Sequence, residues 1–198
     1  MSLETIVSRC RERDINCIAL TDHGGIEGAV KLQHMSPFQV IVGEEVLTSS
    51  GEIIGLFLTE QISSGLSAEE AIRRIRAQGG LVLLPHPCDR FRFAIFKDGV
   101  DEALLAQVDA IEVFNSRSLS PGSAEKARQV ADEYNLPASA GSDAHTPHEL
   151  GNAYVEMPDF KGKEDFLDSL RQGKIFARNS GLMVHVSSNL ARLKKQLF

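Results

Sequence analysis

The chain has 198 residues, 42% of them hydrophobic and 24% charged, and a formal net charge of −6 at pH 7, so it can form one sizeable core but lacks the basic surface typical of nucleic-acid-binding proteins. The charge does not exclude nucleotides or other small phosphorylated substrates, because a bound metal ion supplies positive charge locally. No hydrophobic run reaches the about 18 residues of a membrane span, and the chain begins with a polar helix rather than a signal peptide, so we expect a cytoplasmic protein. Cys10, Cys17 and Cys88 show no CxxC spacing, so we expect no disulfide framework.

Helix-like and strand-like segments alternate along nearly the whole chain, which predicts mostly parallel strands covered by helices. Ser67 and Glu70 have the spacing of a capping box and indicate the start of one helix. We see no linker rich in Pro, Gly or Ser, so residues 1–198 are predicted to form a single domain that ends in a basic helical tail, 189–198. The predicted helices span 3–14, 28–35, 67–78, 101–107, 123–134 and 163–171, and the predicted strands span 15–20, 39–42, 52–58, 81–84, 110–114, 138–140, 153–157 and 174–176.

Short clusters of acidic residues and histidine follow four of the predicted strands. They read Thr21-Asp22-His23, Gly43-Glu44-Glu45, Pro85-His86-Pro87 and Gly141-Ser142-Asp143-Ala144-His145. In a series of strands and helices the ends of such strands converge on one rim, where barrel enzymes keep their sites. Imidazole and carboxylate ligands together suit Zn, Mn or Fe rather than Ca or Cu(I). Taken singly, each cluster is also compatible with a packed loop histidine or a helix-capping carboxylate.

The spacing within the clusters indicates different roles. Asp143 and His145 are two residues apart, so in an extended segment both point to one face and can reach one ion. Asp22 and His23 are adjacent and point apart, which allows His23 to bind a metal while Asp22 carries protons. Of the neighbouring Glu44 and Glu45, one is expected to face the site and the other the solvent.

These motifs, in this order, resemble those of the PHP (polymerase and histidinol phosphatase) family of metal-dependent phosphoesterases. The matching segments are ALTDHGGIEGA, IVGEEVLTSSGEIIGLFL, GLVLLPHPCDRFR, DAIEVFNSR and SAGSDAHTPHELG. The resemblance implies a distorted seven-stranded βα (TIM-like) barrel that holds up to three divalent ions. By position it implies that His23, Glu45, His86, Asp143 and His145 are metal ligands, with Glu45 bridging metals. Glu52 stands where the family usually has a further histidine, and it is either a sixth ligand or a solvent-facing strand residue.

One element of the family pattern is not found in this chain. The family begins with a strand that ends in HxH, whereas this chain begins on a helix and has no histidine before His23. We therefore expect the barrel without its first strand and an incomplete set of metal ligands, which would weaken metal binding. A barrel without that strand leaves an open edge on strand 15–20. We expect this edge either to pair with a second copy of the chain or to be covered by the tail at 189–197.

The leading hypothesis is a phosphoesterase that hydrolyses a small phosphomonoester or a nucleotide with a metal-activated water. Arg92 and Arg117 follow strand ends and are expected to hold the phosphate, because guanidinium binds phosphate in bidentate fashion. Arg90 could do the same. The alternative for each of these residues is a solvated arginine on the surface. Glu112 and Asn115 are weaker candidates. Two rival functions stay open: a non-catalytic PHP-like binding or regulatory domain with an incomplete metal site, and a hydrolase of C–N bonds that uses related metal chemistry.

Overall fold

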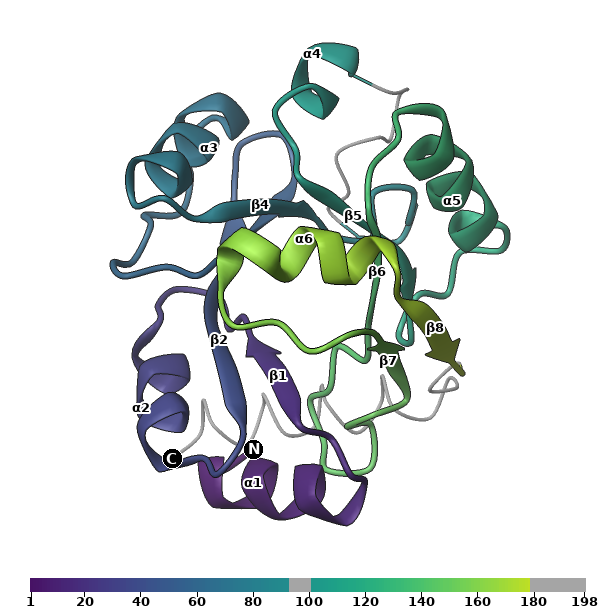
Figure 1. Ribbon diagram of the computed structural model, residues 1–198. Coiled ribbons are helices and arrows are strands. Elements are labelled where there is room, and N and C mark those ends of the chain that lie inside the picture. The colour runs from purple at the N-terminus through teal and green to yellow at the C-terminus, as the bar shows by residue number, and fades with distance from the viewer. Residues whose placement is uncertain (93–100, 179–198) are drawn as a thin grey trace, which may run out of the picture.

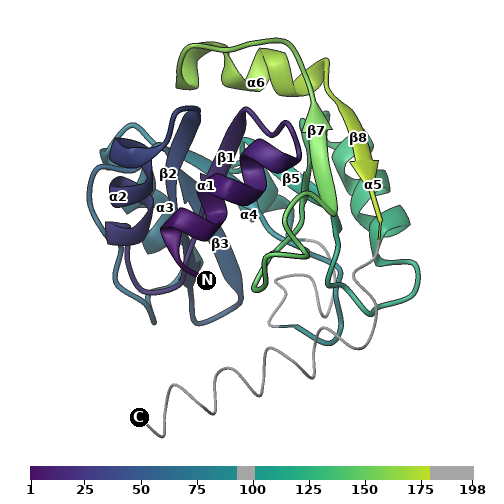
Figure 2. The same ribbon diagram turned by 90° about the horizontal axis from the view of Figure 1, so that it is seen from below.

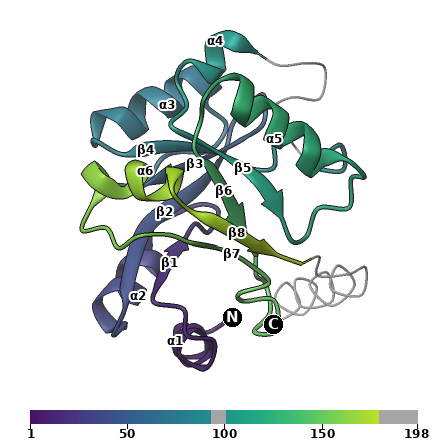
Figure 3. The same cartoon turned by 45° about the vertical axis from the view of Figure 1, so that its right-hand side comes forward.

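The computed structural model describes residues 1–92 and 101–178, and in this part of the chain a six-stranded sheet curls into a half-barrel (Figure 1). Helices α2, α3, α4 and α5 lie around the outer face of this sheet (Figures 1 and 3). In chain order the elements are α1 (Leu3–Glu12), β1 (Cys17–Leu20), α2 (Glu27–Met35), β2 (Gln39–Leu47), β3 (Glu52–Leu56), α3 (Ala68–Ala77), β4 (Leu81–Leu84), α4 (Glu102–Leu105), β5 (Ala110–Asn115), α5 (Ser123–Glu133), β6 (Ala138–Gly141), β7 (Ala153–Glu156), α6 (Lys163–Arg171) and β8 (Lys174–Ala177).

Local sequence signals set the start of two helices. The predicted capping residue Ser67 precedes α3, and its side chain accepts a hydrogen bond of 3.2 Å from the Glu70 backbone N–H. Asp101 caps α4 in the same way by accepting the N–H groups of Ala103 and Leu104. Strand β2 differs from the prediction, because it continues beyond Val42 to Leu47 and carries the Gly-Glu-Glu segment inside the strand rather than after it.

The pairing of the strands differs from the mostly parallel sheet of the predicted barrel in the direction of one strand, β3. Strands β1 and β2, β4 and β5, and β5 and β6 pair in parallel, but β3 is antiparallel to both β2 and β4. The physical reason is the connection at 48–51, which is long enough for a hairpin but too short for the crossover that a parallel pair needs. Strands β7 and β8 form a separate antiparallel pair beside β6. The structure is thus a mixed α/β fold with a curled half-barrel, and a seven-stranded TIM-like barrel is not confirmed.

Helix α6 covers one end of the curled sheet (Figure 2). Its buried Phe166 and Leu170 pack with Ile41, Leu83 and Ala110 from β2, β4 and β5. Ile41 and Ala110 lie in the first half of β2 and β5, and Leu83 is paired with Ala110, so α6 closes the end of the sheet at which these parallel strands begin. The carboxyl ends of the parallel strands therefore lie at the opposite end, which α6 leaves uncovered.

A second group of apolar residues fills the side of the sheet next to β1. Ile6 and Cys10 of α1 pack with Val40 of β2 and with Leu150, which lies in the connection between β6 and β7. Within the described ranges β1 has one strand partner, β2. The predicted tail at 189–198 lies outside the described residues, so its covering of the β1 edge stays a prediction. In the ranges 1–92 and 101–178, none of the helices has the length and apolar character that crossing a bilayer requires.

Candidate metal centre

The predicted ligands lie at the uncovered end of the sheet. His23, His86 and Asp143 follow the last residues of β1, β4 and β6, and Glu52 begins β3, which runs in the opposite direction. Glu45 lies in the last part of β2, two residues before Leu47, the partner of Glu52 in the β2–β3 pair. Glu45 and Glu52 are therefore diagonal neighbours on one face of the sheet, within reach of each other.

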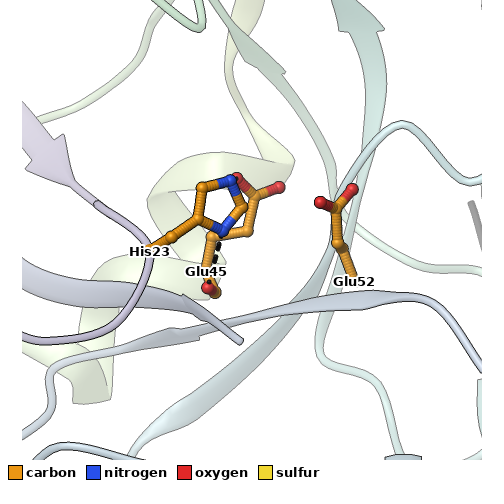
Figure 4. Close-up of side chains that lie close together, drawn as sticks. All are labelled: His23, Glu45 and Glu52. Carbon is orange, nitrogen blue, oxygen red and sulfur yellow. Dashed lines mark hydrogen bonds and ion pairs between the residues drawn. The ribbon is translucent and has the colours of Figure 1, made fainter. Parts of the chain in front are cut away.

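Three of these side chains form a compact cluster. His23, Glu45 and Glu52 each bring one ligand atom to within 4.8 Å of the others. Figure 4 shows the His23 imidazole beside Glu45, with the Glu52 carboxylate directed toward the same space. His23 Nε2 lies 3.4 Å from Glu45 Oε2, and its Nδ1 lies 3.2 Å from the Glu45 backbone oxygen. Glu52, for which the family pattern has histidine, is thus placed among the predicted ligands and not on the solvent side of its strand.

His86 is the fourth member of this cluster. Its Nε2 lies 3.1 Å from Glu45 Oε1 and 3.5 Å from Glu52 Oε2, and its side chain is buried. Burial lowers the pKa of His86, but the Glu45 and Glu112 carboxylates outweigh burial and raise this pKa above its usual value. The pKa of Glu52 is raised by burial and by the neighbouring Glu45. A cation between these groups would relieve the repulsion between the two carboxylates.

Asp143 and His145 form a second group on the same rim. His145 Nδ1 lies 2.9 Å from the Asp143 backbone oxygen and 3.5 Å from Asp143 Oδ1. The other Asp143 oxygen accepts a hydrogen bond from Arg92. Burial lowers the pKa of Arg92, but Asp143, Glu45 and Glu112 together outweigh it and raise this pKa. Arg92 thus lies in the field of carboxylates from both groups of predicted ligands.

The burial of Glu44 differs from what the sequence led us to expect. We expected one of the two adjacent glutamates to face solvent, but Glu44 is fully buried and Glu45 faces the cluster. One Glu44 oxygen accepts the Ile62 backbone N–H at 2.8 Å, and the other has no hydrogen-bond partner. Burial raises the pKa of Glu44. The wrong expectation came from the polar character of glutamate, because the connection at 57–62 covers this face of β2.

Glu112, a weaker candidate in the sequence, lies under the site. Its Oε2 accepts hydrogen bonds from the His86 backbone N–H at 2.9 Å and from Asn115 Nδ2 at 3.1 Å. Burial raises the pKa of Glu112 to about 7, although His86 and Asn115 act in the opposite direction. Gly141 has no room for a Cβ, because Glu112 Oε1 occupies that space. The sequence signals that could have identified this contact are a glutamate inside the apolar run at 110–114 and a glycine at the end of the strand at 138–141.

The remaining predicted residues have different surroundings. Asp22 and Arg90 are exposed, and the role of Asp22 as a proton carrier stays a prediction. Arg117 is buried, and its guanidinium donates to Glu149 Oε1 at 2.7 Å. It therefore lies inside the protein, which excludes the alternative of a solvated surface arginine. Its contact with phosphate stays a prediction that this placement does not favour.

The donor set fits a divalent cation. Two carboxylates from β2 and β3 meet two imidazoles from the loops after β1 and β4. Glu45 lies at ion-pair distance from both His23 and His86, Glu52 lies at ion-pair distance from His86, and His23 and Glu52 bring ligand atoms to within 4.8 Å of each other. The Nδ1 atom of buried His86 has no hydrogen-bond partner, while its Nε2 faces the cluster. Imidazole with carboxylate is a ligand set for Zn, Mn or Fe.

Comparisons with known proteins show what this chain is similar to. Residues 121–175 match the PHP-associated family model (PHP_C). The uncharacterized protein MJ0417 of Methanocaldococcus jannaschii is 43% identical over 141 residues, a match that covers 66% of this chain and 60% of that protein. This chain therefore spans less than two thirds of the relative's length.

Solved structures share the fold. A two-domain protein from Bacteroides vulgatus, described as containing a predicted PHP-like metal-dependent phosphoesterase, aligns with a TM-score of 0.66 and 19% identity over 89% of this chain and 60% of its own. Endonuclease Q, solved with a 27-mer duplex substrate that carries an abasic lesion, aligns with a TM-score of 0.64 and 16% identity over 86% of this chain and 52% of its own. The family match over residues 121–175 and the fold shared with PHP-like structures confirm the resemblance of this chain to the PHP family.

Proposed function

We propose that this chain is a metal-dependent hydrolase of phosphoric esters, acting on a small phosphomonoester or a nucleotide. The observation that carries the proposal is the convergence of His23, Glu45, Glu52 and His86 at the uncovered end of the sheet. The neighbouring Asp143 and His145 complete the proposed ligand set. The fold is shared with a protein described as containing a predicted phosphoesterase and with an endonuclease, which supports hydrolysis as the reaction class.

The side chains have separate tasks in this proposal. His23, Glu45, Glu52 and His86 would hold the first divalent cation, and Asp143 with His145 would add ligands beside it. When bound, such a cation polarises a phosphoryl oxygen and lowers the pKa of a coordinated water. Arg92 lies beside Asp143 and presents the guanidinium best placed to bind the phosphate, because its donors form a planar fork that matches two phosphate oxygens. Exposed Asp22 is positioned on the loop of His23 to exchange a proton with water.

A substrate panel tests the proposal. The chain is loaded separately with Mn²⁺, Zn²⁺ and Fe²⁺ and assayed on p-nitrophenyl phosphate, nucleoside monophosphates, a phosphodiester and amide substrates. We expect phosphate release with at least one metal, its loss in Glu45→Gln, and unchanged rates in the control Glu133→Gln, which alters an exposed carboxylate at the end of α5. Turnover of amides alone would favour the C–N hydrolase. Metal binding without any turnover would favour the binding domain.

Two neighbouring arginines provide a matched pair for the phosphate-binding step. Arg92→Ala should raise KM for the phosphorylated substrate by roughly 10-fold or more, because it removes a charge-assisted contact worth about 1.5–3 kcal/mol. Arg90→Ala removes the same charge two residues away from an exposed position and should leave KM within about twofold. Equal effects of the two substitutions would contradict the assignment of Arg92.

A further inference from the structure

We propose that four buried residues, Glu112, Asn115, Arg117 and Glu149, form a continuous hydrogen-bonded chain, through their side chains and the Arg117 backbone N–H, that fixes the loop after β4 relative to the loop after β6. This buried polar chain would act on metal binding through His86 and His145, so its members are positioning residues. The inference rests on the proposed metal centre, because these two loops carry its predicted ligands.

One end of the buried polar chain holds the His86 loop. The Glu112 carboxylate accepts the His86 backbone N–H at 2.9 Å and the Asn115 side-chain amide at 3.1 Å through the same oxygen. Glu112 and Asn115 are 7% and 6% exposed, so water does not replace these contacts. The Asn115 side-chain oxygen in turn accepts the Arg117 backbone N–H at 2.9 Å.

The other end holds the His145 loop. Arg117 donates to Glu149 Oε1 at 2.7 Å, and the side chains of both residues are buried, at 5% and 2% exposure. The second oxygen of Glu149 accepts the backbone N–H groups of His145 at 3.0 Å and Thr146 at 2.8 Å, and also the Thr146 hydroxyl at 3.0 Å. Both ends of the buried polar chain thus stop on the backbone N–H of a predicted metal ligand.

The backbone of the two loops explains why such support is needed. His86 has φ of +28° and Asp143 has φ of +48°, in the left-handed region that residues with a Cβ rarely adopt. Strained residues of this kind persist where the surrounding structure determines their conformation. Glu112 fixes the amide of His86 itself, and Glu149 fixes the amides that follow Asp143 by two and three residues.

The chemistry of the pair between Arg117 and Glu149 argues against a purely stabilising role. Removing two charges from water is costly, and well-packed apolar residues of similar volume often stabilise a core as well or better. An apolar pair, however, could not accept the N–H groups of His145 and Thr146. The two carboxylate oxygens of Glu149 accept from Arg117, from the His145 and Thr146 N–H groups and from the Thr146 hydroxyl.

The test compares two carboxylates that pair with arginines: Glu149, whose partner Arg117 follows the end of β5, and Asp109, which precedes the start of β5. Glu149→Gln leaves the volume unchanged but places a donor against Arg117 or against the His145 and Thr146 amides. The matched control is Asp109→Asn: Asp109 also pairs with an arginine, Arg76, and accepts a backbone N–H, that of Val82, but it lies just before β5 begins. Calorimetric titration with Mn²⁺ and amide hydrogen exchange are measured for both variants.

We expect Glu149→Gln to weaken Mn²⁺ binding by 10–100-fold, the range found when groups that orient metal ligands are removed. The His145 and Thr146 amides should exchange faster in the metal-free variant. Asp109→Asn should keep Mn²⁺ affinity within about threefold and leave these two amides protected. Arg117→Lys, which keeps the positive charge, should retain more affinity than Arg117→Met. If loss of the ion pair prevents folding, Asn115→Ala cuts the buried polar chain at an uncharged link and should lower the affinity in the same direction.

The outcomes separate this inference from the proposed function. Wild-type affinity and unchanged exchange in folded Glu149→Gln would overturn the inference while the metal centre stands. Equal losses of affinity in Glu149→Gln and Asp109→Asn would also overturn it, because the effect would then be general destabilisation. Failure of the wild-type chain to bind Mn²⁺, Zn²⁺ or Fe²⁺ would overturn the proposed function. In that case faster exchange at His145 and Thr146 in the variant would still support the buried polar chain as the support of these loops.

Discussion

Replacing Gly141 by alanine should destabilise the chain through a single contact. Gly141 lies at the end of β6, and a Cβ added there would overlap Glu112 Oε1 at a distance well below the 3.0 Å that real Cβ contacts keep. The backbone of Gly141 is not in the left-handed region, so the effect is steric and not conformational. The Glu112 carboxylate must move, and its hydrogen bonds to the His86 N–H and the Asn115 amide stretch or break.

The magnitude follows from these two effects. Overpacking a filled site costs about 1–3 kcal/mol, and loss of a buried hydrogen bond costs about 0.5–1.5 kcal/mol. We therefore expect Gly141→Ala to lower the free energy of unfolding by about 2–4 kcal/mol. In a chain of this length each kcal/mol changes Tm by roughly 2–4 °C, so Tm should fall by about 5–15 °C.

The assay is a double-mutant cycle with Glu112→Ala, followed by thermal and urea unfolding in the presence of a chelator. Once the Glu112 side chain has been removed, Gly141→Ala should cost less than about 1 kcal/mol, and the difference between the two backgrounds measures the contact. The same cost in both backgrounds, or an unchanged Tm in the wild-type background, would show that Glu112 does not occupy the space beside Gly141.

Three further predictions concern pH, thiol reactivity and association. Burial raises the pKa of Glu112 to about 7, so the folded chain retains a proton that the unfolded chain releases near pH 4.5. As the pH rises from 4.5 through 7, the unfolding free energy of the metal-free wild type should therefore fall by roughly 3 kcal/mol relative to that of Glu112→Gln. Parallel pH profiles of the two proteins would contradict this. Burial raises the pKa of the Cys17 thiol to about 11. At pH 8 its alkylation by iodoacetamide, measured by mass spectrometry, should therefore be about 100-fold slower than that of a free thiol. A rate equal to that of glutathione would refute the burial of this thiol. The edge of β1 that faces away from β2 should promote self-association, which light scattering would detect as a concentration-dependent mass; a monomer at every concentration would count against pairing through this edge.

Local patterns in the sequence predicted most of the elements and the end of the sheet that carries the candidate site. The apolar run at 81–84 is β4, and the helix predicted at 163–171 is α6. These succeeded because a capping serine or an apolar run between breakers acts over a few residues. His23, Glu45 and His86 could be grouped because each follows a predicted strand, and Glu52 joins them because the resemblance to the PHP family places a ligand there. The structure brings these four side chains together.

Other features depend on contacts between segments far apart in the sequence. The pairing of β3 with β4 joins two segments that α3 separates in the chain, and the apolar pattern of 52–58 is the same with or without this pairing. Arg117 and Glu149 are 32 residues apart, and nothing near either residue in the sequence distinguishes a buried pair from two solvated charges. Glu44 is buried because the connection at 57–62 covers it, which the run Gly43-Glu44-Glu45 does not reveal.

The central claim is that His23, Glu45, Glu52 and His86 surround a divalent cation. Crystals grown with Mn²⁺ or Zn²⁺ and measured on either side of the metal absorption edge test it most directly, because anomalous scattering locates the ion without reference to activity. We predict a peak within about 2.0–2.2 Å of a Glu45 oxygen and of an imidazole nitrogen of His23 or His86, and no peak in Glu45→Gln crystals. Metal-loaded crystals whose anomalous peaks all lie away from these four side chains would contradict the account.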